Sequence, residues 1–165
     1  MKIMIGNDHG GYQLKKSVLD FLKEKGVEVV DIGSHSSDTI VRYPYYASRV
    51  AQAVSSGEVD RGILICSTGI GMSVAANRYK RVRASVCTDP YMAKMTRAHN
   101  NSNLLCLGGR ITGDMLALEI LGVWLDTEYE GGRHKISLGL VQELEEAVSS
   151  ENVWEWTPVD GEVTP

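Results

Sequence analysis

Apolar residues along this chain follow two periods that alternate from one end to the other. Short apolar runs, typical of buried strands, are separated by stretches in which apolar residues recur every three to four positions, as on one face of a helix. The expected strands are Lys2–Gly6, Val27–Ile32, Gly62–Cys66, Arg83–Cys87 and Asn103–Gly108. The expected helices are Tyr12–Lys25, Tyr43–Ser56, Gly69–Asn77, Asp89–His99, Gly113–Asp126 and His134–Ser149.

This alternation of strand and helix predicts the fold class. Consecutive strands joined by helices form parallel sheets with helices on both faces. We therefore expect an α/β fold, a three-layer α/β/α sandwich around a five-stranded parallel, Rossmann-like sheet. Residues 1–149 are predicted to form one domain. Residues 150–165 are predicted to be a C-terminal extension, whose Trp154 and Trp156 lie on the body or on a second subunit.

Composition and charge exclude several classes of function. Of the 165 residues, 43% are hydrophobic and 23% are charged, as in an ordinary soluble globular protein. The net charge of −4 gives no global reason to bind nucleic acid or an anionic membrane. The three cysteines all fall in apolar strands, which predicts reduced thiols and a cytoplasmic protein. No apolar run is long enough to cross a membrane, and no Cys/His spacing predicts a metal site.

The most informative stretch is Gly62–Asn77, where a predicted strand ends in Cys66 and turns through Ser67-Thr68-Gly69-Ile70-Gly71. Ligands of open parallel sheets bind at the carboxyl ends of the strands. Backbone N–H groups of such a turn can bind an anion, and they also favour the thiolate, which is the reactive form of a cysteine. A cysteine at the end of a buried strand is also common as plain core packing, so this stretch alone leaves both interpretations open.

Three predicted turns meet at the carboxyl edge of the expected sheet: Asp8–Gly11, Ser67–Gly71 and Gly108–Arg110. Together they supply a carboxylate, an imidazole, a thiol, two hydroxyls, a cation and a glycine-rich backbone. This combination suits a small polar substrate that carries an anionic group.

Two familiar chemistries do not fit these turns. Thiol phosphatases need an arginine six positions after the cysteine, and that position is Met72. A dinucleotide-binding turn needs a third glycine where this chain has Val74.

Two further groups are ambiguous from sequence. His99 ends a predicted helix that starts at the carboxyl edge and spans roughly 15 Å, so His99 and Cys66 are awkward partners within one chain. If both serve one site, a second subunit would supply His99; otherwise His99 is a favourable cation at a helix C-terminus. Arg133 and His134 oppose the dipole of the last helix, which either a bound phosphate or simple exposure would explain.

Six motifs together resemble the ribose-5-phosphate isomerase type B family, whose relatives isomerise galactose 6-phosphate and allose 6-phosphate. The resemblance spans Met1 to about Ala147. Each motif alone is weak, whereas six in the right order are specific. They are Gly6–Gly11, Tyr43-Pro44, Gly62–Asn77, Arg97–Asn100, Gly108–Arg110 and Tyr129–His134.

The resemblance implies an aldose–ketose isomerase that needs no cofactor and no metal and works as a homodimer with sites shared across the interface. It leaves open whether dimers pair into tetramers. It implies that Cys66 moves a proton between C1 and C2 of the open-chain sugar, that Thr68 assists, and that His99 opens the ring. It further implies substrate contacts from Asp8, His9, Tyr43, Ser67, Gly69, Ile70, Gly71 and Asn100, and phosphate contacts from Arg110 and Arg133.

The chain departs from the family pattern at two positions. Ser67 stands where a glycine is usual, and Ser137 stands where many members carry a second arginine, with Lys135 nearby as an uncertain replacement. The expected reaction is ribose 5-phosphate to ribulose 5-phosphate, a step of the pentose phosphate pathway. The Ser137 departure leaves two alternatives: the same chemistry on an allose, galactose or tetrose phosphate, or a sugar-phosphate binding module without catalysis.

Overall fold

The computed structural model describes residues 1–150, and the chain divides into two compact units, Met1–Gly131 and the part from Gly132 onward. The tail with Trp154 and Trp156 lies outside the described residues, so its expected packing stays a prediction. The assignment of residues 1–149 to one domain likewise stays a prediction.

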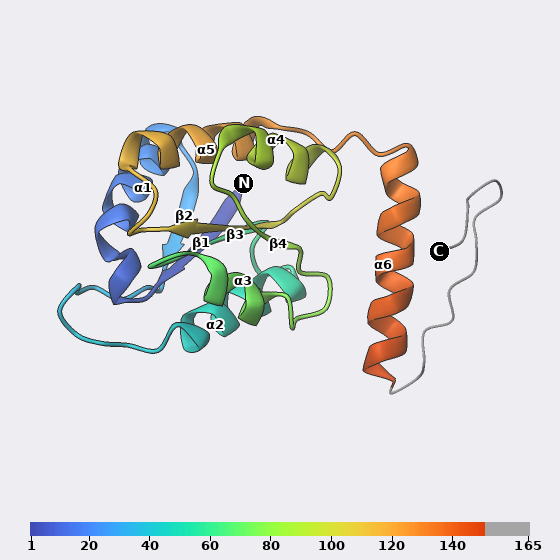
Figure 1. Ribbon diagram of the computed structural model, residues 1–165, viewed down its shortest axis with the longest axis horizontal. Helices are drawn as coiled ribbons and strands as arrows, with labels where there is room; N and C mark the ends of the chain where they lie inside the picture. Colours follow the sequence, from blue (N-terminus) through green and yellow to red (C-terminus); the bar gives the residue numbers. More distant parts are fainter. Residues whose placement is uncertain (151–165) are drawn as a thin grey trace. The chain divides into compact units, whose positions relative to one another are not determined.

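The first unit is the predicted α/β/α sandwich (Figure 1). Its five strands are all parallel and lie in the order β2-β1-β3-β5-β4. The strands are β1 (Lys2–Asn7), β2 (Glu28–Asp31), β3 (Arg61–Cys66), β4 (Ala84–Val86) and β5 (Leu104–Gly108). The helices are a 3₁₀ turn η1 (His9–Gly11), α1 (Tyr12–Glu24), α2 (Tyr43–Ser56), α3 (Ile70–Ala76), α4 (Pro90–Ala98) and α5 (Asp114–Asp126).

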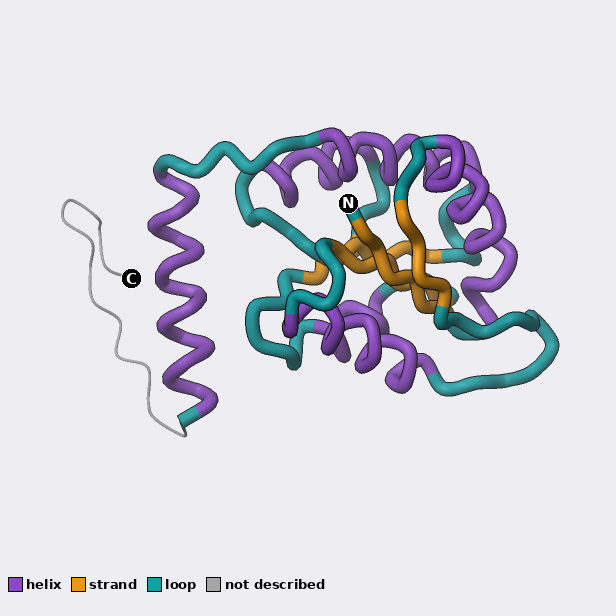
Figure 2. The backbone as a smooth tube through the Cα atoms, turned by 180° about the vertical axis from the view of Figure 1, so that it is seen from behind, coloured by secondary structure: helices purple, strands orange, loops and turns teal. Residues whose placement is uncertain are grey.

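Figure 2 shows the sheet as a layer between helices. Apolar side chains fill the space on both faces of the sheet. Alternate residues of a strand point to opposite faces. Thus Ile63 and Ile65 pack with the core under α1, α4 and α5, whereas Leu64 packs with α2 and α3. The two clusters explain why the central strands are apolar throughout rather than alternating with polar residues.

The ends of the elements follow local rules, and most match the expected ends within one residue. Asp89 caps α4 through its side chain, which accepts a hydrogen bond from the Met92 N–H at 2.9 Å, and Pro90 follows in the first turn. Gly57 ends α2 with a φ of 79°, a left-handed conformation that favours glycine. Strands β2 and β4 are shorter than expected, because they are edge strands and each pairs with one neighbour only.

The sheet order places a switch point between β1 and β3. From β1 the chain moves to β2 on one side, and it then returns to form β3 on the other side. The carboxyl ends of the two strands flanking such a point are the usual place for a ligand. Here these ends carry Asp8 and Cys66, two of the residues that the sequence singles out.

The second unit contains one described helix, α6 (Arg133–Ser149), which begins one residue earlier than expected. None of its residues is buried, although it carries exposed apolar side chains, namely Ile136, Val141, Leu144 and Val148. No helix among the described residues of the chain is both long and apolar enough to cross a membrane.

Candidate active site

The thiol of Cys66 lies at the carboxyl end of β3 and faces a backbone donor. Cys66 is buried, with 6% exposure, and its Sγ accepts a hydrogen bond from the N–H of Gly69 at 3.1 Å. Gly69 has a φ of 80°, and a Cβ at this position would lie 3.1 Å from the carbonyl carbon of Leu107. The sharp turn that aims an N–H at the sulfur therefore requires glycine.

The three turns named from the sequence do meet at this edge. A Cβ on Gly10 would lie 2.4 Å from Ser67 Oγ, and a Cβ on Gly109 would lie 2.8 Å from the carbonyl oxygen of Gly10. The N–H of Gly109 donates to the Cys66 carbonyl at 2.7 Å, and the N–H of Arg110 donates to the Ser67 carbonyl at 3.1 Å. The turns thus pack backbone against backbone, which explains the glycines in all three.

Asp8 shapes the first turn. It is 7% exposed, and its Oδ1 accepts hydrogen bonds from the N–H groups of Gly10 at 2.8 Å and Gly11 at 3.2 Å. One carboxylate oxygen is therefore occupied in capping η1. The N–H of Asp8 also donates to the Ile65 carbonyl of the neighbouring strand at 3.2 Å. This hydrogen bond holds the backbone of Asp8 at the switch point between β1 and β3.

His9 and Tyr43 lie on the wall of a cavity of about 450 Å³ next to this turn. The N–H of Val41 donates to Nδ1 of His9 at 3.4 Å. An imidazole nitrogen that accepts leaves the ring proton on the other nitrogen, Nε2. The ring of Tyr43 packs against Gly71, where a Cβ would lie 3.0 Å from its Cζ. Tyr43 therefore joins the cavity to the Ser67–Gly71 turn.

The other two cysteines differ from Cys66 in their surroundings. Burial, with a smaller contribution from the charge of Asp89, raises the pKa of the Cys87 thiol to about 12. Burial also raises the pKa of Cys106 well above its ordinary value. Both thiols stay protonated at neutral pH and act as small apolar side chains in the core.

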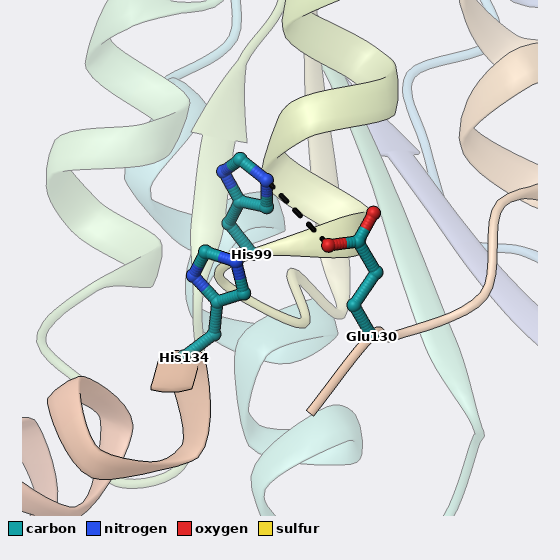
Figure 3. A group of neighbouring side chains, drawn as sticks. All are labelled: His99, Glu130 and His134. Carbon is teal, nitrogen blue, oxygen red and sulfur yellow. Dashed lines mark ion pairs between the residues drawn. The ribbon is translucent and has the colours of Figure 1, made fainter. Parts of the chain in front are cut away.

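His99 lies at the opposite edge of the sheet. It caps the C-terminal end of α4, and the segment after it leads to Leu104, which pairs with Gly62 at the start of β3. Within one chain, therefore, the structure does not bring His99 and its neighbour Asn100 to Cys66. The Nε2 of His99 lies 3.8 Å from Oε2 of Glu130. Figure 3 marks this ion pair with a dashed line.

Arg97 anchors the segment that carries His99. Its guanidinium is buried and donates to the carbonyls of Thr127 at 3.3 Å and Ser102 at 2.6 Å. It also stacks near the Trp124 ring, at 6.0 Å from the centroid. Burial, and then the nearby charge of Arg61, lowers the pKa of Arg97 to about 10, so the side chain remains a cation at neutral pH.

The two predicted phosphate-binding arginines belong to different units of the chain. Arg110 is exposed beside the Ser67 turn, whereas Arg133 opens α6 in the second unit. Sequence reasoning missed the partnership of Glu130 with His99 and the contribution of residues 40–42 to the cavity wall. No periodic pattern marks either feature, because both lie in loops and join residues far apart in the chain.

Comparison with known protein families tests the resemblance stated from the motifs. Residues 3–141 match the family model described as Ribose/Galactose Isomerase. The chain belongs to this family. The resemblance stated from the motifs, and the fold class expected from the periodicity, are both confirmed.

Individual members of the ribose/galactose isomerase family match over nearly their whole lengths. Ribose-5-phosphate isomerase B of Escherichia coli (strain K12) is 48% identical over 145 residues, which cover 88% of this chain and 97% of the relative. The structure of Clostridium thermocellum ribose-5-phosphate isomerase B has a TM-score of 0.87 and 52% identity, covering 90% of this chain and 99% of that one. The Mycoplasma genitalium enzyme, solved with bound ribulose-5-phosphate, has a TM-score of 0.84 and 38% identity, covering 88% and 96%.

Proposed function

We propose that this chain is an aldose–ketose isomerase that converts ribose 5-phosphate into ribulose 5-phosphate through a cis-enediolate. The observation that carries the proposal is the thiol of Cys66 at the carboxyl edge, held by the N–H of Gly69 at 3.1 Å in a chain of the isomerase family. The complex of a family member with ribulose-5-phosphate supports this choice of substrate.

The proposed reaction is a balanced proton transfer that needs no cofactor or metal. The thiolate of Cys66 takes the proton from C2 of the open-chain aldose, and the electron pair of that C–H bond moves to form the C1–C2 double bond. The O1 atom gains a proton and O2 gives one up as the enediol rearranges. The thiol then returns a proton to C1, which leaves a ketone at C2.

The turn after Cys66 stabilises the intermediate in this scheme. An enediolate carries negative charge on oxygen, and preorganised N–H donors are a large contribution to lowering the energy of such a state. The turn from Ser67 to Gly71 supplies backbone donors at this point, with Thr68 assisting through its hydroxyl. The Thr68 Oγ1 accepts a hydrogen bond from the Ile70 N–H at 3.3 Å, which orients the hydroxyl.

The proposal includes a homodimer with shared sites, and the position of His99 supports this part of it. Ring opening needs an acid or base near the sugar, and His99 of the same chain lies at the far edge of the sheet. In the proposal a second copy supplies His99, Asn100 and Arg133 to each site. The exposed apolar side chains of α6, including Ile136 and Val148, support an interface between copies, because such surfaces mark interaction sites.

A cytoplasmic location is part of the proposal. The three cysteines are free, and Cys87 and Cys106 are buried without a disulfide partner. Free buried thiols fit a reducing compartment, where the pentose phosphate pathway operates on the same substrates.

Solvent exchange tests the chemistry. Turnover of ribose 5-phosphate in deuterated water is expected to place deuterium at C1 of the ketose, and Cys66→Ala is expected to abolish turnover. Cys87→Ala is the matched control, because it removes a thiol from the same fold outside the site. Turnover without deuterium incorporation, or an active Cys66→Ala variant, would contradict the proposal.

The second candidate keeps this chemistry and changes the substrate. Ser137 motivates it, because the family resemblance implies an arginine at this position in many members and this chain has a serine. Comparing kcat/KM for ribose 5-phosphate with the values for allose 6-phosphate, galactose 6-phosphate and a tetrose phosphate decides between them. Binding of any of these sugars without isomerisation would instead indicate a binding module.

A further inference from the structure

The cavity beside the first turn has one cation on its wall, Arg42, to which neither the motifs nor the family match assigns a role. Its lining combines Asp8, His9 and Tyr43 with the preceding segment Ile40–Arg42 and with Pro44 and Tyr45. Arg42 is the only arginine or lysine in this lining. A guanidinium on the wall of a substrate cavity is either paired within the protein or available to a ligand.

Arg42 is not paired within the described part of the chain. Its side chain is exposed and forms no hydrogen bond or ion pair with any described residue. Arg49, seven positions later, shows the contrast, since its guanidinium binds both carboxylate oxygens of Glu58 at 2.8 and 3.0 Å. The charge of Arg42 is thus available at the cavity.

The neighbouring groups favour an anion in the same place. Because Nδ1 of His9 accepts the N–H of Val41, its Nε2 carries the proton and is a donor. Asp8 is the single carboxylate of the lining, and its Oδ1 already accepts hydrogen bonds from the N–H groups of Gly10 and Gly11. The cavity therefore combines a guanidinium, an imidazole N–H and a phenol with one partly neutralised carboxylate.

We infer that Arg42 binds the phosphate group of the substrate beside His9, as a charged contact in addition to those expected from Arg110 and Arg133. Guanidinium groups bind phosphate oxygens through two parallel N–H donors, which orients as well as attracts the group. Asp8 then meets a sugar hydroxyl rather than the phosphate. This inference rests on the proposed function for its substrate, and it adds a specificity-determining residue to that site.

Replacement of Arg42 tests the inference through the split between KM and kcat. Arg42→Gln is expected to raise KM for ribose 5-phosphate about tenfold, the usual effect of one lost charge-assisted hydrogen bond, while kcat stays within about twofold. Arg42→Lys is expected to recover part of the loss. Arg49→Gln is the matched control, because it removes an exposed arginine of α2 away from the cavity, and its KM is expected to equal that of the wild type.

Inorganic phosphate separates a phosphate contact from a hydroxyl contact. As a competitive inhibitor it is expected to bind about tenfold more weakly to Arg42→Gln than to the wild type or to Arg49→Gln. Equal inhibition of all three proteins would overturn the inference, and so would an unchanged KM.

Calorimetric titration with ribose 5-phosphate makes the inference independent of turnover. If the wild type binds the sugar but does not isomerise it, the proposed function fails, and weaker binding to Arg42→Gln still supports the inference. If the wild type isomerises and Arg42→Gln behaves like Arg49→Gln, the inference fails and the proposed function stands. A wild type that binds neither ligand overturns the inference as well.

Discussion

Gly71→Ala separates the stability of the fold from the function of the cavity. Gly71 lies in the first turn of α3, and its φ is not in the left-handed region, so an alanine is compatible with the backbone. The new Cβ would lie 3.0, 3.1 and 3.3 Å from three ring carbons of Tyr43. Contacts of this length require the Tyr43 ring to move by a few tenths of an ångström. The ring can move because Tyr43 is 38% exposed.

The expected consequence is a functional loss without a folding loss. Because a misplacement of about 1 Å at a reactive site can cost roughly a hundredfold, the smaller displacement of Tyr43 is expected to lower kcat/KM by about tenfold. The free energy of unfolding should change by less than about 1 kcal/mol, since the helix gains from alanine what the contact costs.

Gly122→Ala provides the matched control for this experiment. Gly122 lies within α5, and its Cβ would meet only Phe21 Cζ at 3.5 Å, an ordinary contact. Alanine in a helix interior is expected to raise stability by about 1 kcal/mol, or roughly 2–4 °C in Tm, with kcat/KM unchanged. Thermal unfolding and initial rates measure both variants. If Gly71→Ala keeps the wild-type kcat/KM, the Tyr43 ring has no role in substrate contact and the reasoning is wrong.

Two further predictions concern stability. Lys15 is 2% exposed, and its Nζ binds Asp31 at 3.0 Å and the Ser34 carbonyl at 2.9 Å. Lys15→Met is therefore expected to lower the free energy of unfolding by about 2 kcal/mol, after allowance for the partial exposure of Asp31. Urea unfolding measures this change, and a change below about 0.5 kcal/mol would contradict the expectation. Because the folded state raises the pKa of Cys87 from 9.0 to about 12, its stabilising contribution is complete below pH 9 and is lost as pH rises toward 12. Stability should therefore fall above pH 9, and less steeply in Cys87→Ala; equal slopes would refute this.

Local sequence determined most of the architecture of this protein. The periods of apolar residues located every strand and every α-helix of the described chain, because the spacing of apolar residues reflects which sides of an element are buried. The short 3₁₀ helix His9–Gly11 was expected only as a turn. Capping residues such as Asp89 set helix ends for the same local reason. The glycines of the Ser67–Gly71 turn also marked the place of the candidate active site, since few other residues allow such a backbone.

The sequence also ranked Cys66 above the other thiols, though only as one of two interpretations. Its position directly before a glycine-rich turn suggested a reactive group, whereas Cys106 lies inside its strand and Cys87 is followed by Thr88-Asp89-Pro90. The hydrogen bond from Gly69 to its sulfur shows the geometry behind that suggestion. The roles of the residues at the site stay predictions until the variants above are measured.

Only the tertiary structure decided which distant residues meet. The contact of Val41 with His9, the position of Arg42 on the cavity wall and the ion pair of His99 with Glu130 all join loops that have no repeating pattern. Spacing along a chain reports which face of an element is buried, but it does not report where a loop lies. That depends on how the whole sheet and its helices pack, and so these contacts became visible only in the folded molecule.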